Sequence, residues 1–466
     1  MAITLPAQTV TNLHNFDVTD GQFPFAGLVQ AANGDLYGNT YSGGASPNND
    51  GTIFKITPSG TLTTVYNFCE LTNCTDGATP IGPLVQDSNG NLYGTSGYGG
   101  ANGRGIVFKI SAGGMLTTLY NFCNLAGCAD GSQPYAGLVQ ASNGNLYGTT
   151  EFGGANSHGT VFEITPAGTL TTLYSFCALS GCADGVSPSA GLVQAGNGDF
   201  YGTTQDGGAN HNNDCDAYGC GTVFKITPGG GLTTLHSFCA KTGCADGQTP
   251  VAGLVLASNG NFYGTTQLGG ADNNNGTVFE ITPTGNFKTL YNFCSQSGCT
   301  DGQGPIGGLI QATDGDLYGT TSAGGIGYGT IYKITPSGSL TTLHSFLNTD
   351  GSEPYGTLVQ DTNGTFYGTT FIGGANGYGT VYSLSVGSGP FVETVPTSGK
   401  VGAAVKILGS SLTGATSVTF NGTAAVFTVV SSSEITTTVP SGATSGAVKV
   451  TTPHSMLSSN VPFVIP

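Results

Sequence analysis

Residues 137–150 read GLVQASNGNLYGTT, and residues 159–176 read GTVFEITPAGTLTTLYSF. In both stretches apolar residues alternate with polar ones, which is typical of strands that bury one face. The Asn143-Gly144 step between the first two apolar groups favours a type I′ hairpin turn. The two stretches therefore predict four antiparallel strands, at Gly137 to Ala141, Asn145 to Thr149, Gly159 to Ile164 and Thr169 to Phe176.

The same phrase occurs seven times, with a period of about 55 residues. Its clearest marker is the tyrosine of a Tyr-Gly step, found at Tyr37, Tyr93, Tyr147, Tyr201, Tyr263, Tyr318 and Tyr367. Repeated units of four antiparallel strands are typical of the blades of a β-propeller. We therefore predict an all-β chain in which residues 1–387 form a seven-bladed β-propeller.

The two ends of the repeat region complement each other. The seventh repeat stops after its third strand, Gly379 to Leu384, whereas Thr9 to Phe16 resembles a fourth strand with no blade before it. Pairing these segments would remove the sheet edges that an open array leaves exposed. The N-terminal strand is expected to complete the last blade.

Residues 388–466 follow a different pattern, with no Tyr-Gly step and no cysteine. Short segments rich in Val, Ile and Thr predict a small β-sandwich as a second domain. The predicted strands are Val401 to Leu408, Ser417 to Phe420, Ala424 to Val430, Glu434 to Val439 and Ala447 to Thr451.

Both regions resemble known families. The repeat is similar to the GloVer (Gloeobacter/Verrucomicrobia) tandem repeat of secreted bacterial proteins, over residues 9–386. The tail resembles an IPT/TIG immunoglobulin-like domain, so an immunoglobulin-like β-sandwich is implied. The motifs that carry this resemblance are PTSG (396–399), VKILG (405–409), ATSVTFNG (415–422) and VPSG (439–442). The GloVer resemblance implies export and varied C-terminal anchors, but no established activity.

Charge and location are consistent with that resemblance. Ten basic and 26 acidic residues give a net charge of −16, which argues against nucleic acid and anionic membrane surfaces as partners. No apolar run approaches the ~18 residues of a membrane span.

We expect an extracellular or cell-surface protein. The start at Met1 lacks a signal peptide's basic and apolar regions, and no anchor precedes Pro466, so both are expected to lie outside this sequence.

All twelve cysteines fall into pairs separated by four residues: Cys69/Cys74, Cys123/Cys128, Cys177/Cys182, Cys215/Cys220, Cys239/Cys244 and Cys294/Cys299. Five pairs bracket a four-residue insertion between one blade and the next, so we predict six disulfides, which suit an exported protein. The alternative is zinc. It requires two pairs from different blades to converge, and neighbouring linkers are expected to lie too far apart.

Two sets of aspartates are candidate cation ligands. Each linker ends in an Asp-Gly step, where the carboxylate caps a turn or, alternatively, joins a ring around a cation. We favour the cap at Asp20, Asp76, Asp130, Asp184, Asp246, Asp301 and Asp350. Asp214 and Asp216 resemble half of a calcium loop but lack the later Glu of an EF-hand. Apart from possible structural calcium, no cofactor is expected.

The candidate binding surface is the face where the sequence varies between repeats. The loops after the second strands lie there, as does the longest insertion, Asn210 to Cys220. Aromatic rings suit stacking on sugars, and amides suit bonds to hydroxyls. The candidate ligand-binding residues are Tyr41, Tyr98, Phe152, Gln205, Gln267 and Phe371. The alternative is that these aromatics only pack loops together.

Two functions follow from this surface. The first is a binding or adhesion module for a neutral glycan or an extracellular protein. The second is a glycan-active hydrolase, in which Glu151 and Asp206 on adjacent blades serve as general acid and as base or nucleophile. Against the second stands the alternative that both are solvated loop acids. A purely structural role in surface assembly has no distinguishing feature in the sequence.

Overall fold

The computed structural model describes residues 8–46, 48–210, 215, 218–271 and 274–465. The all-β prediction is confirmed, because the helical elements of these residues are short 3-10 turns. They lie in five of the linkers between repeats, at η1 (Thr72–Cys74), η2 (Ala126–Cys128), η3 (Ser180–Cys182), η4 (Thr242–Cys244) and η5 (Ser297–Cys299). No helix in the described part of the chain is long and apolar enough to cross a membrane.

The repeats form seven four-stranded antiparallel sheets, each with its strands in chain order except the last, which β1 completes. The first strands are β2 (Val29–Gln30), β6 (Val85–Gln86), β10 (Val139–Gln140), β14 (Val193–Gln194), β18 (Val255–Leu256), β22 (Ile310–Gln311) and β26 (Val359–Gln360). The second strands are β3 (Leu36–Thr40), β7 (Leu92–Ser96), β11 (Leu146–Thr150), β15 (Phe200–Thr204), β19 (Phe262–Thr266), β23 (Leu317–Thr321) and β27 (Phe366–Thr370).

The third and fourth strands complete each sheet. The third strands are β4 (Thr52–Ile56), β8 (Ile106–Ile110), β12 (Thr160–Ile164), β16 (Thr222–Ile226), β20 (Thr277–Ile281), β24 (Thr330–Ile334) and β28 (Thr380–Ser385). The fourth strands are β5 (Leu62–Asn67), β9 (Leu116–Asn121), β13 (Leu170–Ser175), β17 (Leu232–Ser237), β21 (Phe287–Asn292), β25 (Leu340–Ser345) and, in the last sheet, β1 (Thr9–Asn15).

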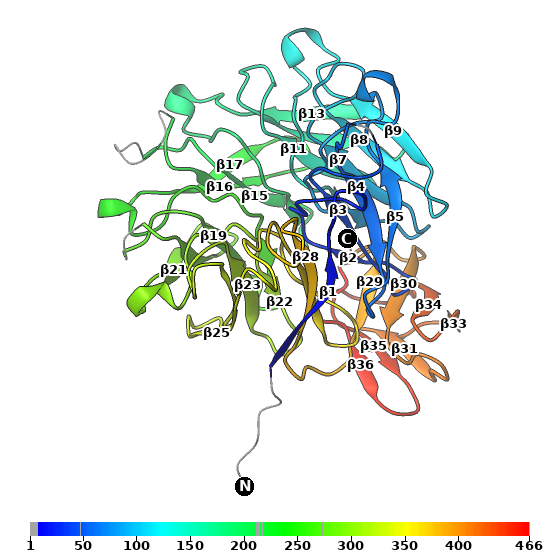
Figure 1. Cartoon of the computed structure of the whole chain (residues 1–466). Coiled ribbons are helices and arrows are strands. Elements are labelled where there is room, and N and C mark those ends of the chain that lie inside the picture. Colours follow the sequence, from blue (N-terminus) through cyan, green and yellow to red (C-terminus); the bar gives the residue numbers. More distant parts are fainter. Residues whose placement is uncertain (1–7, 47, 211–214, 216–217, 272–273, 466) are drawn as a thin grey trace.

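The N-terminal strand belongs to the last sheet, as predicted. β1 runs antiparallel to β28, with Thr9 opposite Ser385 and Asn15 opposite Thr380. Figure 1 shows the blue β1 beside the gold β28. The two ends of the repeat region are therefore held together by backbone hydrogen bonds.

The Tyr-Gly step recurs because a phenyl ring of the adjacent strand needs the space. In the third repeat, a Cβ on Gly148 would lie 2.7 Å from Cζ of Phe162 and 2.8 Å from Cδ2 of Leu138. Phe162 is itself fully buried. Any larger residue at position 148 would force the packed ring aside, and protein cores accommodate such overpacking poorly.

The predicted type I′ turn at Asn143-Gly144 is wrong. Gly144 has a φ of +84°, whereas Asn143 is not among the residues of positive φ. The Gly144 N–H donates to the Ala141 carbonyl, and the Ala141 N–H donates to the Asn145 carbonyl. This is a three-residue loop in which glycine takes the left-handed position. The Asn143 side chain stabilises the loop by accepting the Asn145 N–H at 3.0 Å.

The apolar core lies between neighbouring sheets. In one cluster, Tyr147 and Phe176 of the third repeat pack with Phe200 of the fourth. Another joins the last repeat to the first through Tyr367 and Phe54. A hydrogen bond also links each repeat to the next and the seventh to the first. Its donor and acceptor residues are Asn39 and Gly82, Thr95 and Ala136, Thr149 and Ala190, Thr203 and Ala252, Thr265 and Gly307, Thr320 and Pro354, and Thr369 and Ala26.

The tail forms two further four-stranded sheets around a separate core that includes Val405, Ile407, Val418 and Phe420. One sheet has the order β29 (Val392–Val395), β30 (Ala404–Gly409), β34 (Glu434–Thr438) and β33 (Phe427–Val429). The other has the order β32 (Thr423–Ala424), β31 (Ser417–Phe420), β35 (Val448–Thr451) and β36 (Met456–Ser458). The predicted strand from Ala424 to Val430 is therefore two strands, and β29 and β36 were not predicted.

Candidate functional site

A cavity of about 530 Å³ lies where all seven repeats meet. Each linker contributes the residues just before its first strand. These are Phe25–Gly27, Ile81 and Pro83, Tyr135–Leu138, Ser189–Leu192, Val251–Leu254, Ile306–Leu309 and Tyr355–Thr357. Three further lining residues, Glu151, Gln205 and Gln267, directly follow the second strands of three consecutive repeats.

Strand alternation decides which loop residues reach the cavity. Glu151, Gln205 and Gln267 line it, and the residues after them do not. Those following residues, Phe152, Asp206 and Leu268, instead form isolated bridges with the incoming linkers. Successive side chains of an extended segment point to opposite sides. The residue equivalent to Glu151 on the next sheet is therefore Gln205, and Asp206 lies one position further along its loop.

Four polar side chains of the cavity wall have no hydrogen-bond partner among the described residues. Among the described residues, no hydrogen bond involves the side chain of Glu151, Gln205 or Gln267. The Ser189 hydroxyl is buried and also lacks a partner. Most buried polar groups in proteins are hydrogen-bonded. These four side chains are thus available to a bound molecule.

Glu151 differs from an ordinary surface carboxylate. Burial, and to a smaller extent the negative charge of Asp206, together raise its pKa to about 7. Burial penalises the charged form of a carboxyl group, and a nearby like charge does the same. Near neutral pH, Glu151 therefore exists both as a hydrogen-bond donor and as a charged acceptor.

Aromatic rings form part of the cavity wall. The Tyr135 hydroxyl donates to the Tyr98 hydroxyl at 2.8 Å. A Cβ on Gly97 would lie 2.2 Å from Cε1 of Tyr135, so the glycine makes room for this ring. Elsewhere on the wall, Tyr355 stacks on Phe371 with ring centroids 5.0 Å apart. The rings are held in place by their neighbours.

The predicted ligand-binding residues occupy different places. Gln205 and Gln267 line the cavity, whereas Tyr41, Tyr98 and Phe152 lie outside its wall with 38%, 41% and 41% of their surface exposed. Phe371 packs against Tyr355, in agreement with the loop-packing alternative.

The linkers also contribute aromatic residues and Ser189 to the wall, and these residues are not in the predicted ligand-binding set. In the sequence these residues share one position, which varies between repeats and directly precedes an Ala or Gly. The position is occupied by Phe25, Ile81, Tyr135, Ser189, Val251, Ile306 and Tyr355.

The linker aspartates are turn caps. Asp130 is 1% exposed and accepts the Tyr120 hydroxyl at 2.9 Å and the N–H groups of Asn124 and Leu125 at 2.9 and 3.1 Å. Asp76, Asp184 and Asp301 have the same three kinds of partner, and histidine replaces tyrosine beside Asp246. The carboxylates are occupied by local hydrogen bonds, which supports the cap over the cation ring.

All twelve cysteines form the six predicted disulfides. Two pairs converge within the fourth repeat, where Cys215 Sγ lies 3.6 Å from Cys239 Sγ. The reason is that Cys215 belongs to the long loop after β15 rather than to a linker, and this loop reaches the linker after β17. The possible calcium ligands Asp214 and Asp216 lie outside the described residues.

Comparison with solved structures gives weak overall likenesses. A gluconolactonase of Xanthomonas campestris is 13% identical, with 66% of this chain and 87% of that chain covered and a TM-score of 0.40. A luciferin-regenerating enzyme is 10% identical, with 83% and 98% covered and a TM-score of 0.41. A Dyadobacter fermentans protein of unknown function is 10% identical, with 82% and 99% covered and a TM-score of 0.43.

No curated protein matches the chain. The model of a repeat family matches three times, at residues 1–129, 124–299 and 212–428. These matches together span most of the sequence, including all seven four-stranded repeats. The chain belongs to the Gloeobacter/Verrucomicrobia repeat family.

Proposed function

We propose that residues 1–387 form a seven-bladed β-propeller and that residues 388–466 form an IPT/TIG immunoglobulin-like domain. Seven four-stranded sheets, linked each to the next and the last to the first by apolar clusters and hydrogen bonds, support the propeller. Two four-stranded sheets around one core support the second domain. In this arrangement the propeller carries the binding site and the smaller domain acts as a spacer.

The function that the cavity supports best is the binding of a neutral, polyhydroxylated ligand, such as the end of a glycan. One observation carries this proposal: Glu151, Gln205 and Gln267 face the cavity without protein partners. An amide both donates and accepts hydrogen bonds, as a sugar hydroxyl does. The volume of about 530 Å³ lies within the usual range of small-ligand sites.

The wall also indicates the charge of the ligand. No lysine or arginine is among its lining residues, so nothing there would neutralise a carboxylate or phosphate. Phe25, Tyr135 and Tyr355 offer apolar ring surface. A ligand with hydroxyls on its edges and C–H groups on its faces fits this combination better than an anion does.

The proposed location is extracellular or at the cell surface. Six disulfides account for every cysteine, and disulfides persist in oxidising compartments. A glycan-binding propeller in this location would act as an adhesion or capture module.

Hydrolysis of the bound glycan is the second candidate. The observation that favours it is the pKa of about 7 at Glu151, which suits a general acid. Asp206 raises that pKa but is not among the cavity-lining residues, so a second catalytic carboxylate within the wall is lacking among the described residues. Binding without turnover is therefore the preferred function.

The experiment is a glycan array probed with the full chain, followed by calorimetry on any neutral oligosaccharide that binds. We expect Gln205→Ala to weaken binding and Phe152→Ala, the exposed control, to leave it unchanged. Binding that depends on Phe152 but not on Gln205, or a protein partner in place of a glycan, would contradict the cavity site. Product analysis with Glu151→Gln separates the two candidates, because only a hydrolase has turnover to lose.

A further inference from the structure

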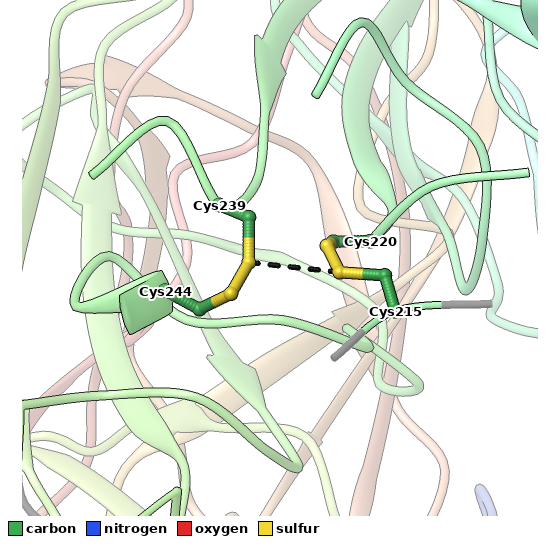
Figure 2. A group of neighbouring side chains, drawn as sticks. All are labelled: Cys215, Cys220, Cys239 and Cys244. Carbon is green, nitrogen blue, oxygen red and sulfur yellow. Dashed lines mark hydrogen bonds between the residues drawn. A yellow bond between two sulfur atoms is a disulfide. The ribbon is translucent and has the colours of Figure 1, made fainter. Parts of the chain in front are cut away.

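Four cysteine sulfurs from two separate segments meet at the edge of the fourth repeat. Cys215 and Cys220 lie in the long loop between β15 and β16, and Cys239 and Cys244 lie in the linker after β17. All four sulfurs lie within 4.8 Å of one another. Figure 2 shows the two disulfides facing each other, with the contact between Cys215 and Cys239 marked.

Two other repeats also place a polar side chain beside the cysteine pair of the linker. The residue just before the glycine that precedes the third strand lies over the linker's cysteine pair. In the first repeat it is Asp50, grouped with Cys69 and Cys74, and in the third it is His158, grouped with Cys177 and Cys182. In the fourth repeat the equivalent residue is Cys220, and Cys215 adds a second sulfur. Among the described residues, this is the one group with four cysteines.

We propose that Cys215, Cys220, Cys239 and Cys244 form a tetrathiolate zinc site when their two disulfides are reduced. This corner of the protein then holds either two disulfides or one Zn²⁺. With Zn–S bonds of about 2.3 Å, tetrahedral geometry places sulfurs about 3.8 Å apart, within the spread of the cluster. The spacing of four residues within each pair is also typical of structural zinc sites.

The conversion is a balanced reduction followed by metal binding. Each disulfide gains two electrons and two protons from a phosphine and a water molecule, and the phosphine leaves as its oxide. The four thiols then bind Zn²⁺ as thiolates and release four protons. Cys220 and Cys244 are buried, whereas Cys215 and Cys239 are only partly so, which gives the reductant and the metal a route to the cluster.

The test uses the full chain, reduced anaerobically with a phosphine and titrated with Co²⁺, a spectroscopic substitute for zinc. We expect one Co²⁺ per chain with the d–d and thiolate charge-transfer absorption of a tetrahedral sulfur site, displaced by one equivalent of Zn²⁺. The paired variant Cys215→Ser with Cys220→Ser should lose this signal. The matched control, Cys294→Ser with Cys299→Ser, removes a linker pair outside the cluster and should retain it.

A second readout identifies the ligands in the unmodified protein. Bound Zn²⁺ should protect Cys215, Cys220, Cys239 and Cys244 from alkylation, as mapped by peptide mass spectrometry, while Cys294 and Cys299 react. The proposal is wrong if the reduced protein shows no tetrahedral cobalt spectrum. It is equally wrong if the Cys215→Ser and Cys220→Ser variant keeps the spectrum, or if zinc protects no cysteine.

Discussion

Two groups of polar side chains near the strand ends differ in whether other protein groups satisfy their hydrogen bonds. The linker aspartate Asp130, for example, is buried and accepts three hydrogen bonds, one from the Tyr120 hydroxyl of β9 and two from N–H groups of its own linker. The cavity residues Glu151, Gln205 and Gln267 have no such partners among the described residues. The first group recurs in every repeat, whereas the second varies between repeats. Recurrence with saturated hydrogen bonds is expected of the fold's framework, and variation with unsatisfied groups is expected of the proposed binding site.

The largest expected effect is on stability, from Asp130→Ala. This change leaves one tyrosine hydroxyl and two backbone N–H groups without their acceptor, and an unsatisfied buried group costs about 1–3 kcal/mol. We expect the free energy of unfolding to fall by about 3 kcal/mol in chemical denaturation. Glu151→Gln is the control and should unfold at nearly the wild-type denaturant concentration. Equal effects of the two changes would remove the distinction between the groups.

The next effect is on affinity, from the double change of Gln205→Ala and Gln267→Ala. Two hydrogen bonds to a ligand, at about 1 kcal/mol each, correspond to a loss of roughly thirtyfold in affinity. Stability should change by less than about 0.5 kcal/mol, because no protein partner is lost. Calorimetry and denaturation on the same samples measure both quantities. If the double variant is destabilised but binds with unchanged affinity, Gln205 and Gln267 stabilise the fold and do not bind the ligand.

A smaller effect is the contribution of Glu151 to the pH dependence of folding stability. Its pKa is raised from 4.5 to about 7, so the folded state holds this proton more tightly than the unfolded chain does. The stability that the proton provides is fully present below about pH 4.5 and is lost as the pH rises through about 7. Denaturation at several pH values should show a decline in this window that Glu151→Gln reduces. If the stability of the variant declines identically with pH, a group other than Glu151 causes the decline.

The smallest effect is expected from Tyr98→Phe. It removes the hydroxyl that accepts from Tyr135 at 2.8 Å, at a site where Tyr98 is 41% exposed. Water replaces the lost partner, so stability should fall by about 0.5 kcal/mol at most. Gly97→Ala is the sharper companion variant, since its Cβ would meet the Tyr135 ring directly. If the Tyr135 ring helps to bind the ligand, Gly97→Ala should weaken affinity more than Tyr98→Phe does.

Sequence reasoning predicted the strands better than the cavity. The period-two alternation identified the four strands of the third repeat to within about two residues, and the unmatched segment at Thr9 correctly predicted its pairing with the last sheet. The predicted turn at Asn143 is wrong because Asn-Gly fits more than one turn type, and the hydrogen bond that the Asn143 side chain accepts from the Asn145 N–H stabilises the three-residue loop.

The site could be predicted only in part. Glu151 and Asp206 are both variable loop acids, and their sequence positions suggest equivalence until strand alternation is counted from Thr150 and Thr204. The proximity of Cys215 to Cys239 depends on where a long insertion folds back, which no local pattern specifies. Contacts between variable loops are set by tertiary packing, so local sequence patterns do not predict them.

The most direct test of the central claim is a crystal structure of the protein with a bound neutral oligosaccharide. The account predicts a sugar ring inside the cavity, with hydroxyls within hydrogen-bond distance of the Gln205 and Gln267 amides and a ring face against Tyr135 or Tyr355. A sugar bound on the exposed ring of Phe152, with the cavity filled only by water, would contradict it.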